Sequence, residues 1–173
     1  MTAFRLSVER DLPAIMAIVI KAQAYLASRG VDQWRDGYPD EKVMREDMRL
    51  LQGYVLLREE KVAGIATIVF TGESSYDEIF EGAWTTPEPY ACIHRIAVDA
   101  ALRGSGAADE LMRQAEAVIR ARGVLSVRID THRDNLAMRR MLVRNGYRPC
   151  GVIYLREGNE RGAARVALEK RLE

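Results

Sequence analysis

The segment Arg103-Gly104-Ser105-Gly106-Ala107-Ala108 constrains the fold of this chain more than any other. It follows an apolar segment, Ala91–Val98, and it opens a stretch from Gly104 to Arg122 whose apolar residues recur at helical spacing. The start of a helix presents amide groups without intrahelical acceptors and a partial positive charge, and both suit a diphosphate. The segment therefore predicts a strand–turn–helix unit able to bind an anion. A turn that only leads into a tightly packed helix would show the same pattern.

This segment departs from two common phosphate-binding patterns. The Gly-Lys-Ser/Thr ending of a nucleoside triphosphate loop is missing, and the third glycine of a dinucleotide-binding turn would fall at Asp109. What remains is a run of five small residues, Gly104 to Ala108, through which a ligand could approach the backbone closely. Arg103 adds a positive charge beside it. Nucleoside triphosphates and NAD are thus disfavoured as ligands.

Hydrophobic periodicity predicts the remaining elements as alternating strands and helices. The expected strands are Ala3–Val8, Tyr54–Arg58, Val62–Phe70, Ala91–Val98, Leu125–Asp130, Gly151–Leu155 and Ala163–Leu168. The expected helices run from Glu9 to Gly30, from about Asp40 to Leu51, from Gly104 to Arg122 and from Asn135 to Arg144. This order predicts one α/β domain over residues 1–173, with a mixed sheet of about seven strands flanked by about four helices.

Composition excludes several classes of protein. The 26 basic and 25 acidic residues leave a formal charge of +1, which gives no support for a nucleic-acid or membrane partner. Two cysteines make no disulfide framework, and two histidines without a cysteine cluster predict no metal site. The apolar run Leu12–Ile20 lacks a basic region before it and is shorter than a membrane span. We therefore expect an internal amphipathic helix and a cytoplasmic protein.

Two stretches of the chain resemble one enzyme family. Ile93–Asp99 followed by Leu102–Ala108 closely resembles the central motif of the GNAT superfamily of acetyl-CoA-dependent N-acetyltransferases, with Arg103, Gly106 and Ala108 in its marked positions. Asn135 and, eleven residues later, Gly146-Tyr147 match the second motif of that family. The order of elements agrees from Phe4 to Lys170, so the resemblance covers nearly the whole chain.

The resemblance implies where acetyl-CoA, the only cofactor expected, would bind. In such a fold the strands Ala91–Val98 and Leu125–Asp130 splay apart and form the coenzyme A cleft. Backbone groups of Ile96 and Val98 would pair with pantetheine, the amides from Arg103 to Ala108 would hold the pyrophosphate, and Asn135 would contact the pantetheine arm. The implied cofactor-binding residues are thus Ile96, Val98, Arg103, Gly104, Ser105, Gly106, Ala107, Ala108 and Asn135.

The same resemblance implies transfer of an acetyl group to a primary amine, by direct attack in a ternary complex. Many members carry a tyrosine seven residues after the motif asparagine as a general acid, but here that position is Leu142. A thiol with a pKa of about 8.5 leaves tolerably without such an acid. Tyr154 or Tyr147 could replace it, and of these Tyr154 is our candidate.

His94 is the candidate general base. An amine with a pKa of about 10.4 is neutral only about once in 2500 molecules at pH 7, so its proton must be removed before attack. Imidazole titrates near neutral pH, and a histidine so placed is similar to that of arylalkylamine acetyltransferases. The backbone N–H of Val98 could stabilise the oxyanion. A strand histidine hydrogen-bonded in a polar seam is the alternative reading of His94.

Four aromatic residues in loops are candidates for the acceptor pocket: Trp34, Tyr38, Trp84 and Tyr90. Trp34 and Tyr38 could instead anchor their loop to the core, and Trp84 could belong to a lid or a dimer contact. Bulky aromatics favour a small-molecule amine. Two alternatives remain: a non-catalytic acyl-CoA-binding or sensing domain, and an enzyme that acetylates a peptide or protein. A homodimer is a further expectation, because dimers are common in the resembled family.

Overall fold

The structure is a computed structural model that describes all residues 1–173. The strands are β1 (Thr2–Leu6), β2 (Gly53–Arg58), β3 (Lys61–Val69), β4 (Tyr90–Val98), β5 (Ser126–Thr131), β6 (Arg148–Tyr154) and β7 (Ala164–Arg171). The helices are α1 (Leu12–Ser28), α2 (Glu41–Arg49), α3 (Ala107–Ala121) and α4 (Leu136–Arg144). Three short 3₁₀ turns lie at Glu9–Asp11, Ser74–Tyr76 and Ala100–Leu102.

The seven strands form one sheet in the order β1-β2-β3-β4-β5-β7-β6. β1–β2, β2–β3, β5–β7 and β6–β7 are antiparallel pairs. β4 and β5 are parallel, and their ladder covers only Tyr90–Cys92 against Ser126–Arg128 although both strands continue beyond it. The predicted fold class, a mixed and largely antiparallel sheet with four helices, is thus confirmed.

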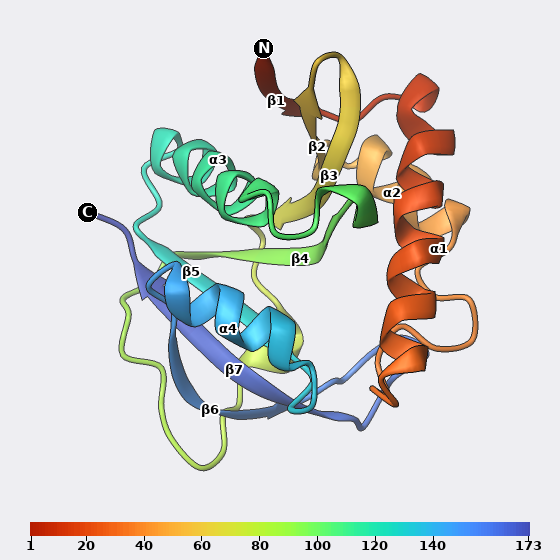
Figure 1. Ribbon diagram of the computed structural model, residues 1–173. Helices are drawn as coiled ribbons and strands as arrows, with labels where there is room; N and C mark the ends of the chain where they lie inside the picture. The colour runs from red at the N-terminus through yellow and green to blue at the C-terminus, as the bar shows by residue number, and fades with distance from the viewer. The chain divides into compact units, whose positions relative to one another are not determined.

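The chain divides into two compact units. The first unit comprises Met1–Ile68 and His94–Ala115, and the second comprises Val69–Ile93 and Glu116–Glu173. In the first unit the β1–β2–β3 meander adjoins α1 and α2, which lie next to each other (Figure 1). Its core is made of buried residues of α1, α2 and the strands, namely Leu12, Ile15, Ile18, Val19, Met44, Val55, Ile65 and Ala97.

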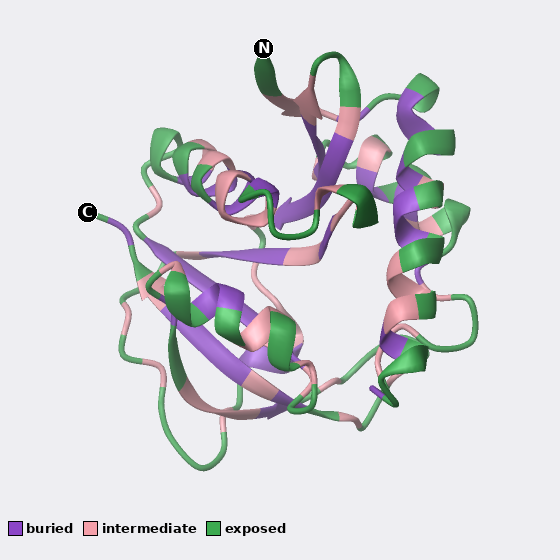
Figure 2. Ribbon diagram, in the orientation of Figure 1, coloured by how far each residue is buried: buried purple, intermediate pink, exposed green.

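Helix α1 shows why an apolar sequence need not be a membrane span. The apolar run Leu12–Ile20 is part of a longer helical segment. Glu9–Ser28, which comprises the first 3₁₀ turn and α1, has 20 residues and a mean hydropathy of 1.2, enough by length and composition alone to cross a membrane. Core helices pass the same test, however. One side of α1 is buried in the core of the first unit and the other is exposed (Figure 2).

The second unit is built on the β5–β7–β6 ladder, and α4 packs on β6. The long loop between β3 and β4 pairs with this ladder through an isolated bridge between Phe80 and Val152, and Ala83 N donates to the carbonyl of Cys150 at 3.0 Å. Tyr76 of that loop is buried with Cys92, Ile153 and Ala167 in the core of the unit. The loop is therefore packed against its own unit over part of its length.

Glu169 of β7 fixes the middle of the same loop. Its carboxylate accepts hydrogen bonds from the backbone N–H groups of Thr85 and Thr86, at 2.8 and 3.1 Å, and from both threonine hydroxyls. Burial opposes ionisation of Glu169, but these hydrogen bonds outweigh it, so the pKa of Glu169 lies below its ordinary value. One charged group thus satisfies four donors of two consecutive loop residues.

We expect Glu169→Gln to lower the free energy of unfolding by about 1–3 kcal/mol at neutral pH, because hydrogen bonds to a charged acceptor contribute more than neutral ones. The folded pKa is lowered, so this stabilisation is complete above the unfolded pKa of about 4.3 and is lost as the pH falls through the folded value. Urea unfolding near pH 7 and near pH 3 measures it. The exposed Glu157→Gln is the matched control. An equal loss at both pH values would contradict the assignment.

Candidate functional site

The turn before α3 has the geometry of an anion-binding site. Gly104 and Gly106 both adopt left-handed backbone conformations, each with a φ of 79°, which residues other than glycine rarely adopt. Helix α3 therefore begins at Ala107 and not at Gly104 as predicted. Its first intrahelical bond runs from Glu110 N to Gly106 O (3.0 Å), so the amides of Ala107 and Ala108 precede the hydrogen-bonded part of the helix.

The surface above this turn is open. A Cβ atom added to Gly104 or Gly106 would meet no heavy atom within 4 Å. Arg103, Gly104, Ser105 and Gly106 are exposed. The exposed glycines would let an anionic group reach the backbone amides directly. The residues present thus fit the diphosphate predicted from the sequence.

A second guanidinium, which the sequence analysis missed, lies beside the turn. Arg58, the last residue of β2, donates to the hydroxyl of Ser105 (3.1 Å) and to the carboxylate of Glu110 (2.7 and 3.0 Å). This pairing offsets the negative charge of Glu110 in the first turn of α3. No local sequence pattern links Arg58 to a turn 47 residues away. Arg103 itself stacks on Tyr25, with its guanidinium carbon 4.1 Å from the ring centroid.

Strand β4 contains an irregular residue next to the candidate base. Arg95 has a φ of 49°, while the strand continues on either side of it. In a regular strand, every second side chain points to the same face. The left-handed conformation of Arg95 interrupts this alternation, so the spacing of His94, Ile96 and Val98 does not show that they share a face. His94 is half-buried, with its Nε2 atom buried. Ile96 is buried and Val98 is half-buried.

The side chain of Arg95 sits in a buried network that sequence reasoning also missed. Its Nε and Nη2 atoms each donate to the carboxylate of Asp47 at 2.7 Å, and its Nη1 donates to the hydroxyl of Tyr38 at 3.1 Å. Thr67 donates to the same carboxylate at 2.7 Å. Burial disfavours the charge of Arg95, yet the bonds from Asp47 keep the pKa of Arg95 above its ordinary value.

The four predicted acceptor-pocket aromatics are all partly buried, two in each unit. In the first unit, Trp34 packs against the core, which favours the anchoring alternative, and Tyr38 bonds to Arg95. In the second unit, Trp84 donates from Nε1 to the carbonyl of Tyr76 (2.9 Å), and the hydroxyl of Tyr90 accepts from Glu73 N (3.2 Å). Trp84 is thus fastened to its own unit, which argues against a mobile lid.

A guanidinium packs against two of these rings. The guanidinium carbon of Arg128 lies 4.0 Å from the centroid of Tyr90 and 4.6 Å from that of Trp84. Arg128 is only 4% exposed. Burial raises the pKa of Tyr90 above its ordinary value. The geometry makes Trp84 and Tyr90 components of the packed interior of the second unit.

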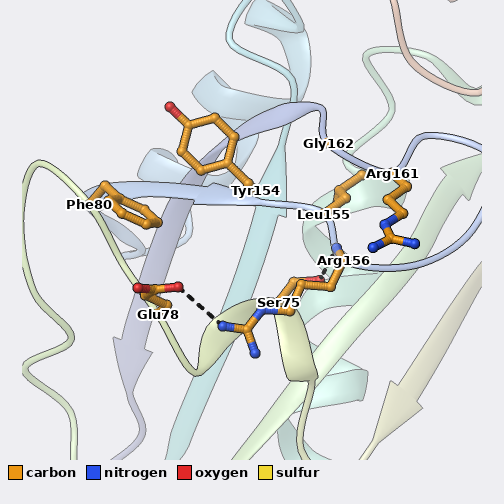
Figure 3. Close-up of a pocket in the computed structure, with 8 residues that line it drawn as sticks. All are labelled: Ser75, Glu78, Phe80, Tyr154, Leu155, Arg156, Arg161 and Gly162. Carbon is orange, nitrogen blue, oxygen red and sulfur yellow. Dashed lines mark hydrogen bonds and ion pairs between the residues drawn. The ribbon is translucent and has the colours of Figure 1, made fainter.

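Tyr154 lines a hollow of about 420 Å³ in the second unit (Figure 3). Its ring meets that of Phe80 edge-on, with centroids 5.3 Å apart. Arg156, which also lines the hollow, pairs with Glu78 at 3.3 Å. Tyr154 is 46% exposed, whereas Tyr147 is 1% exposed, and burial holds the pKa of Tyr147 well above its ordinary value. Of the two tyrosines, Tyr154 is the accessible one.

Asn135 stands at the N-cap of α4, where its side chain accepts from Met138 N at 3.2 Å. Its contact with pantetheine stays a prediction. Leu142 is completely buried, so the usual position of the acid is filled by a core residue.

Both cysteines are free, and burial raises the pKa of Cys150 to about 12. No group of three or more His, Cys, Asp or Glu side chains is arranged to hold a metal ion.

Comparison with known proteins decides the family. The profile of the Acetyltransferase (GNAT) family matches residues 21–147, which include the turn, β4 and the second motif. The chain belongs to the GNAT acetyltransferase family. It is therefore an acyltransferase of a family that uses acetyl-CoA and acts on amine acceptors. A search of curated proteins gave no match.

Three solved structures are similar to this chain over nearly its whole length. An acetyltransferase of the GNAT family from Streptococcus agalactiae has a TM-score of 0.85 and 29% identity, over 99% of this chain and 96% of that one. A GNAT acetyltransferase from Listeria monocytogenes has a TM-score of 0.72 and 21% identity, over 99% and 95%. The PaiA N-acetyltransferase from Thermoplasma acidophilum, solved in complex with coenzyme A, has a TM-score of 0.68 and 13% identity, over 99% of each chain.

The open turn leads to a test of where acetyl-CoA binds. We expect Gly106→Glu to weaken acetyl-CoA binding at least about tenfold, because it places bulk and negative charge above the amides. Calorimetric titration measures the affinity. Gly123→Glu is the matched control, since Gly123 has a similar φ of 75° and open space but follows the C-terminus of α3. Undiminished affinity in folded Gly106→Glu would refute the placement.

Proposed function

We propose that residues 1–173 act as one N-acetyltransferase domain that transfers an acetyl group from acetyl-CoA to the primary amine of a small molecule, by direct attack in a ternary complex. The observation that carries the proposal is the exposed left-handed turn at Gly104 and Gly106, which leads into the first amides of α3. An exposed turn that leads into helix amides suits a diphosphate such as that of coenzyme A.

The chain's own residues hold the cosubstrate in this proposal. Backbone amides from Arg103 to Ala108 bind the pyrophosphate, and Arg58 keeps Ser105 in place within that turn. Backbone groups of Ile96 and Val98 bind the pantetheine arm, and the contact of Asn135 with that arm stays a prediction from the sequence. Acetyl-CoA supplies an acetyl group activated as a thioester.

His94 and two further groups carry the chemistry. His94 removes a proton from the bound ammonium, because only the neutral amine has a lone pair for attack. The backbone N–H of Val98 offsets negative charge that develops on the acetyl oxygen. The role of Tyr154 as the acid that would protonate the departing thiolate stays a prediction from the sequence. The exposure of Tyr154 keeps its hydroxyl available, whereas Leu142 offers no proton.

The acceptor is proposed to be a small amine because aromatic side chains are concentrated in the loops. Tyr38 and Trp34, in the loop between α1 and α2, would border it. The roles of Trp84 and Tyr90 in the acceptor pocket stay predictions from the sequence, and both rings are bonded within the second unit.

An assay of thiol release with acetyl-CoA and a panel of small amines and peptides tests the activity. We expect turnover with at least one small amine, and initial-rate patterns that intersect when both substrates are varied, because both must be bound together before transfer. Turnover with peptides alone would favour a protein-modifying enzyme. Coenzyme A binding without turnover of any amine would favour a sensor and contradict the proposal.

Replacing His94 with Ala tests the base. We expect the rate constant kcat to fall about 10²- to 10⁴-fold, and the shape of the pH–rate profile to change, because the proton acceptor is lost. The acetyl-CoA affinity should change little, since the pyrophosphate turn is untouched. His132→Ala is the matched control: His132 accepts from Asp134 N (3.1 Å) in a turn of the second unit. An unchanged rate and profile for His94→Ala would remove His94 from the mechanism.

A further inference from the structure

Arg95 is the one non-glycine residue of positive φ that lies inside a strand. The others lie in loops and turns, where such conformations are common: Trp34, Asp36, Leu51, Glu59, Glu60 and Glu81. A side chain with a Cβ atom disfavours this conformation, so surrounding contacts must maintain it. In this strand the strained residue directly follows His94 and directly precedes Ile96, the first residue expected to bind pantetheine.

The contacts that maintain it come from three other elements of the first unit. Asp47 of α2 binds the guanidinium through both of its oxygens, at 2.7 Å each, and is itself only 5% exposed. Thr67 of β3 donates to Asp47 and is 2% exposed. Tyr38 accepts from the third nitrogen at 3.1 Å and belongs to the loop between α1 and α2. The planar fork of arginine can meet all of these partners at once, and an ammonium cannot.

We propose that Arg95 is a positioning residue of the acetyl transfer. Through Asp47 it holds the left-handed kink of β4, and so it sets the direction of the main-chain groups of Ile96 and Val98. Through Tyr38 it holds the loop expected to border the acceptor amine. Arg95 touches neither substrate in this account, and it transfers no proton. The inference rests on the proposed function, because it assigns a role within that reaction.

Three variants separate the contact of Arg95 with Asp47 from its contact with Tyr38. Arg95→Lys and Asp47→Asn each remove the two-pronged bond between the guanidinium and the carboxylate. We expect kcat to fall about 10- to 100-fold, the scale of a small misplacement of reacting groups. Affinity for coenzyme A should stay within about threefold, because most of its binding groups lie in the turn from Arg103 to Ala108. Tyr38→Phe cuts only the loop connection. We expect it to raise KM for the amine with kcat little changed.

A pair of substitutions tests the kink itself. In an Asp47→Asn background, which removes the unpaired buried carboxylate, Arg95→Gly and Arg95→Ala both lack the guanidinium. Glycine adopts a positive φ freely, and alanine does not. We expect the glycine variant to retain about tenfold more activity than the alanine variant. Arg49→Lys, in an exposed ion pair with Glu46, is the matched control for the change from arginine to lysine.

Hydrogen–deuterium exchange gives a readout that needs no activity. We expect faster exchange in peptides covering residues 93–99 and 33–40 of Arg95→Lys and Asp47→Asn, with residues 103–110 unchanged.

Wild-type rates and exchange in folded variants would overturn the inference and leave the proposed function standing. Equal activity of the glycine and alanine variants would overturn the role of the kink. A wild-type enzyme that acetylates no amine would overturn the proposed function, and the exchange result would still decide whether Arg95 holds the kink. If Arg95→Lys fails to fold, Tyr38→Phe with an unchanged KM overturns the loop connection.

Discussion

The start of α3 depends on two backbone conformations that only glycine adopts readily. Because Gly104 and Gly106 adopt left-handed conformations, the helix begins at Ala107, and the turn that precedes it is exposed. Neither glycine carries a side chain over the backbone of that turn. Arg58 reinforces the arrangement from another strand, since it fastens Ser105 and offsets the charge of Glu110. In our proposal the cosubstrate site is thus built from backbone geometry, with side chains as its support.

The chemistry has a different physical basis. Acetyl transfer to an amine requires a neutral nucleophile in a fixed direction, and we propose that β4 meets both requirements. His94 is adjacent to the kink at Arg95, and the buried fork between Arg95 and Asp47 maintains that kink. In our account the turn supplies affinity for acetyl-CoA, whereas the kink supplies alignment. Variants of the two regions should therefore affect binding and rate separately.

Sequence patterns predicted most of the fold because its elements have local signals. Apolar spacing marked α1 and the strands, and the glycine-rich turn marked the start of a helix to within three residues. The missed features are contacts between distant residues. Asp47 and Arg95 are 48 residues apart, and nothing near either one in the sequence announces a partner. The kink was not predicted because a positive φ is expected at glycine, and this position holds an arginine. The packing of Trp84, predicted as an acceptor-pocket residue with a lid or a dimer contact as alternatives, was missed because its partners, Tyr76 and Arg128, are visible only in three dimensions.

The central claim is that coenzyme A lies on the turn from Arg103 to Ala108 and along the end of β4. Titration of ¹⁵N-labelled protein with coenzyme A, followed by the backbone amide signals in NMR spectra, tests it most directly. The account predicts the largest shifts at Gly104 to Ala108, with further shifts at Ile96 and Val98. Shifts confined to the hollow around Phe80 and Tyr154, with the amides of the turn unmoved, would contradict it.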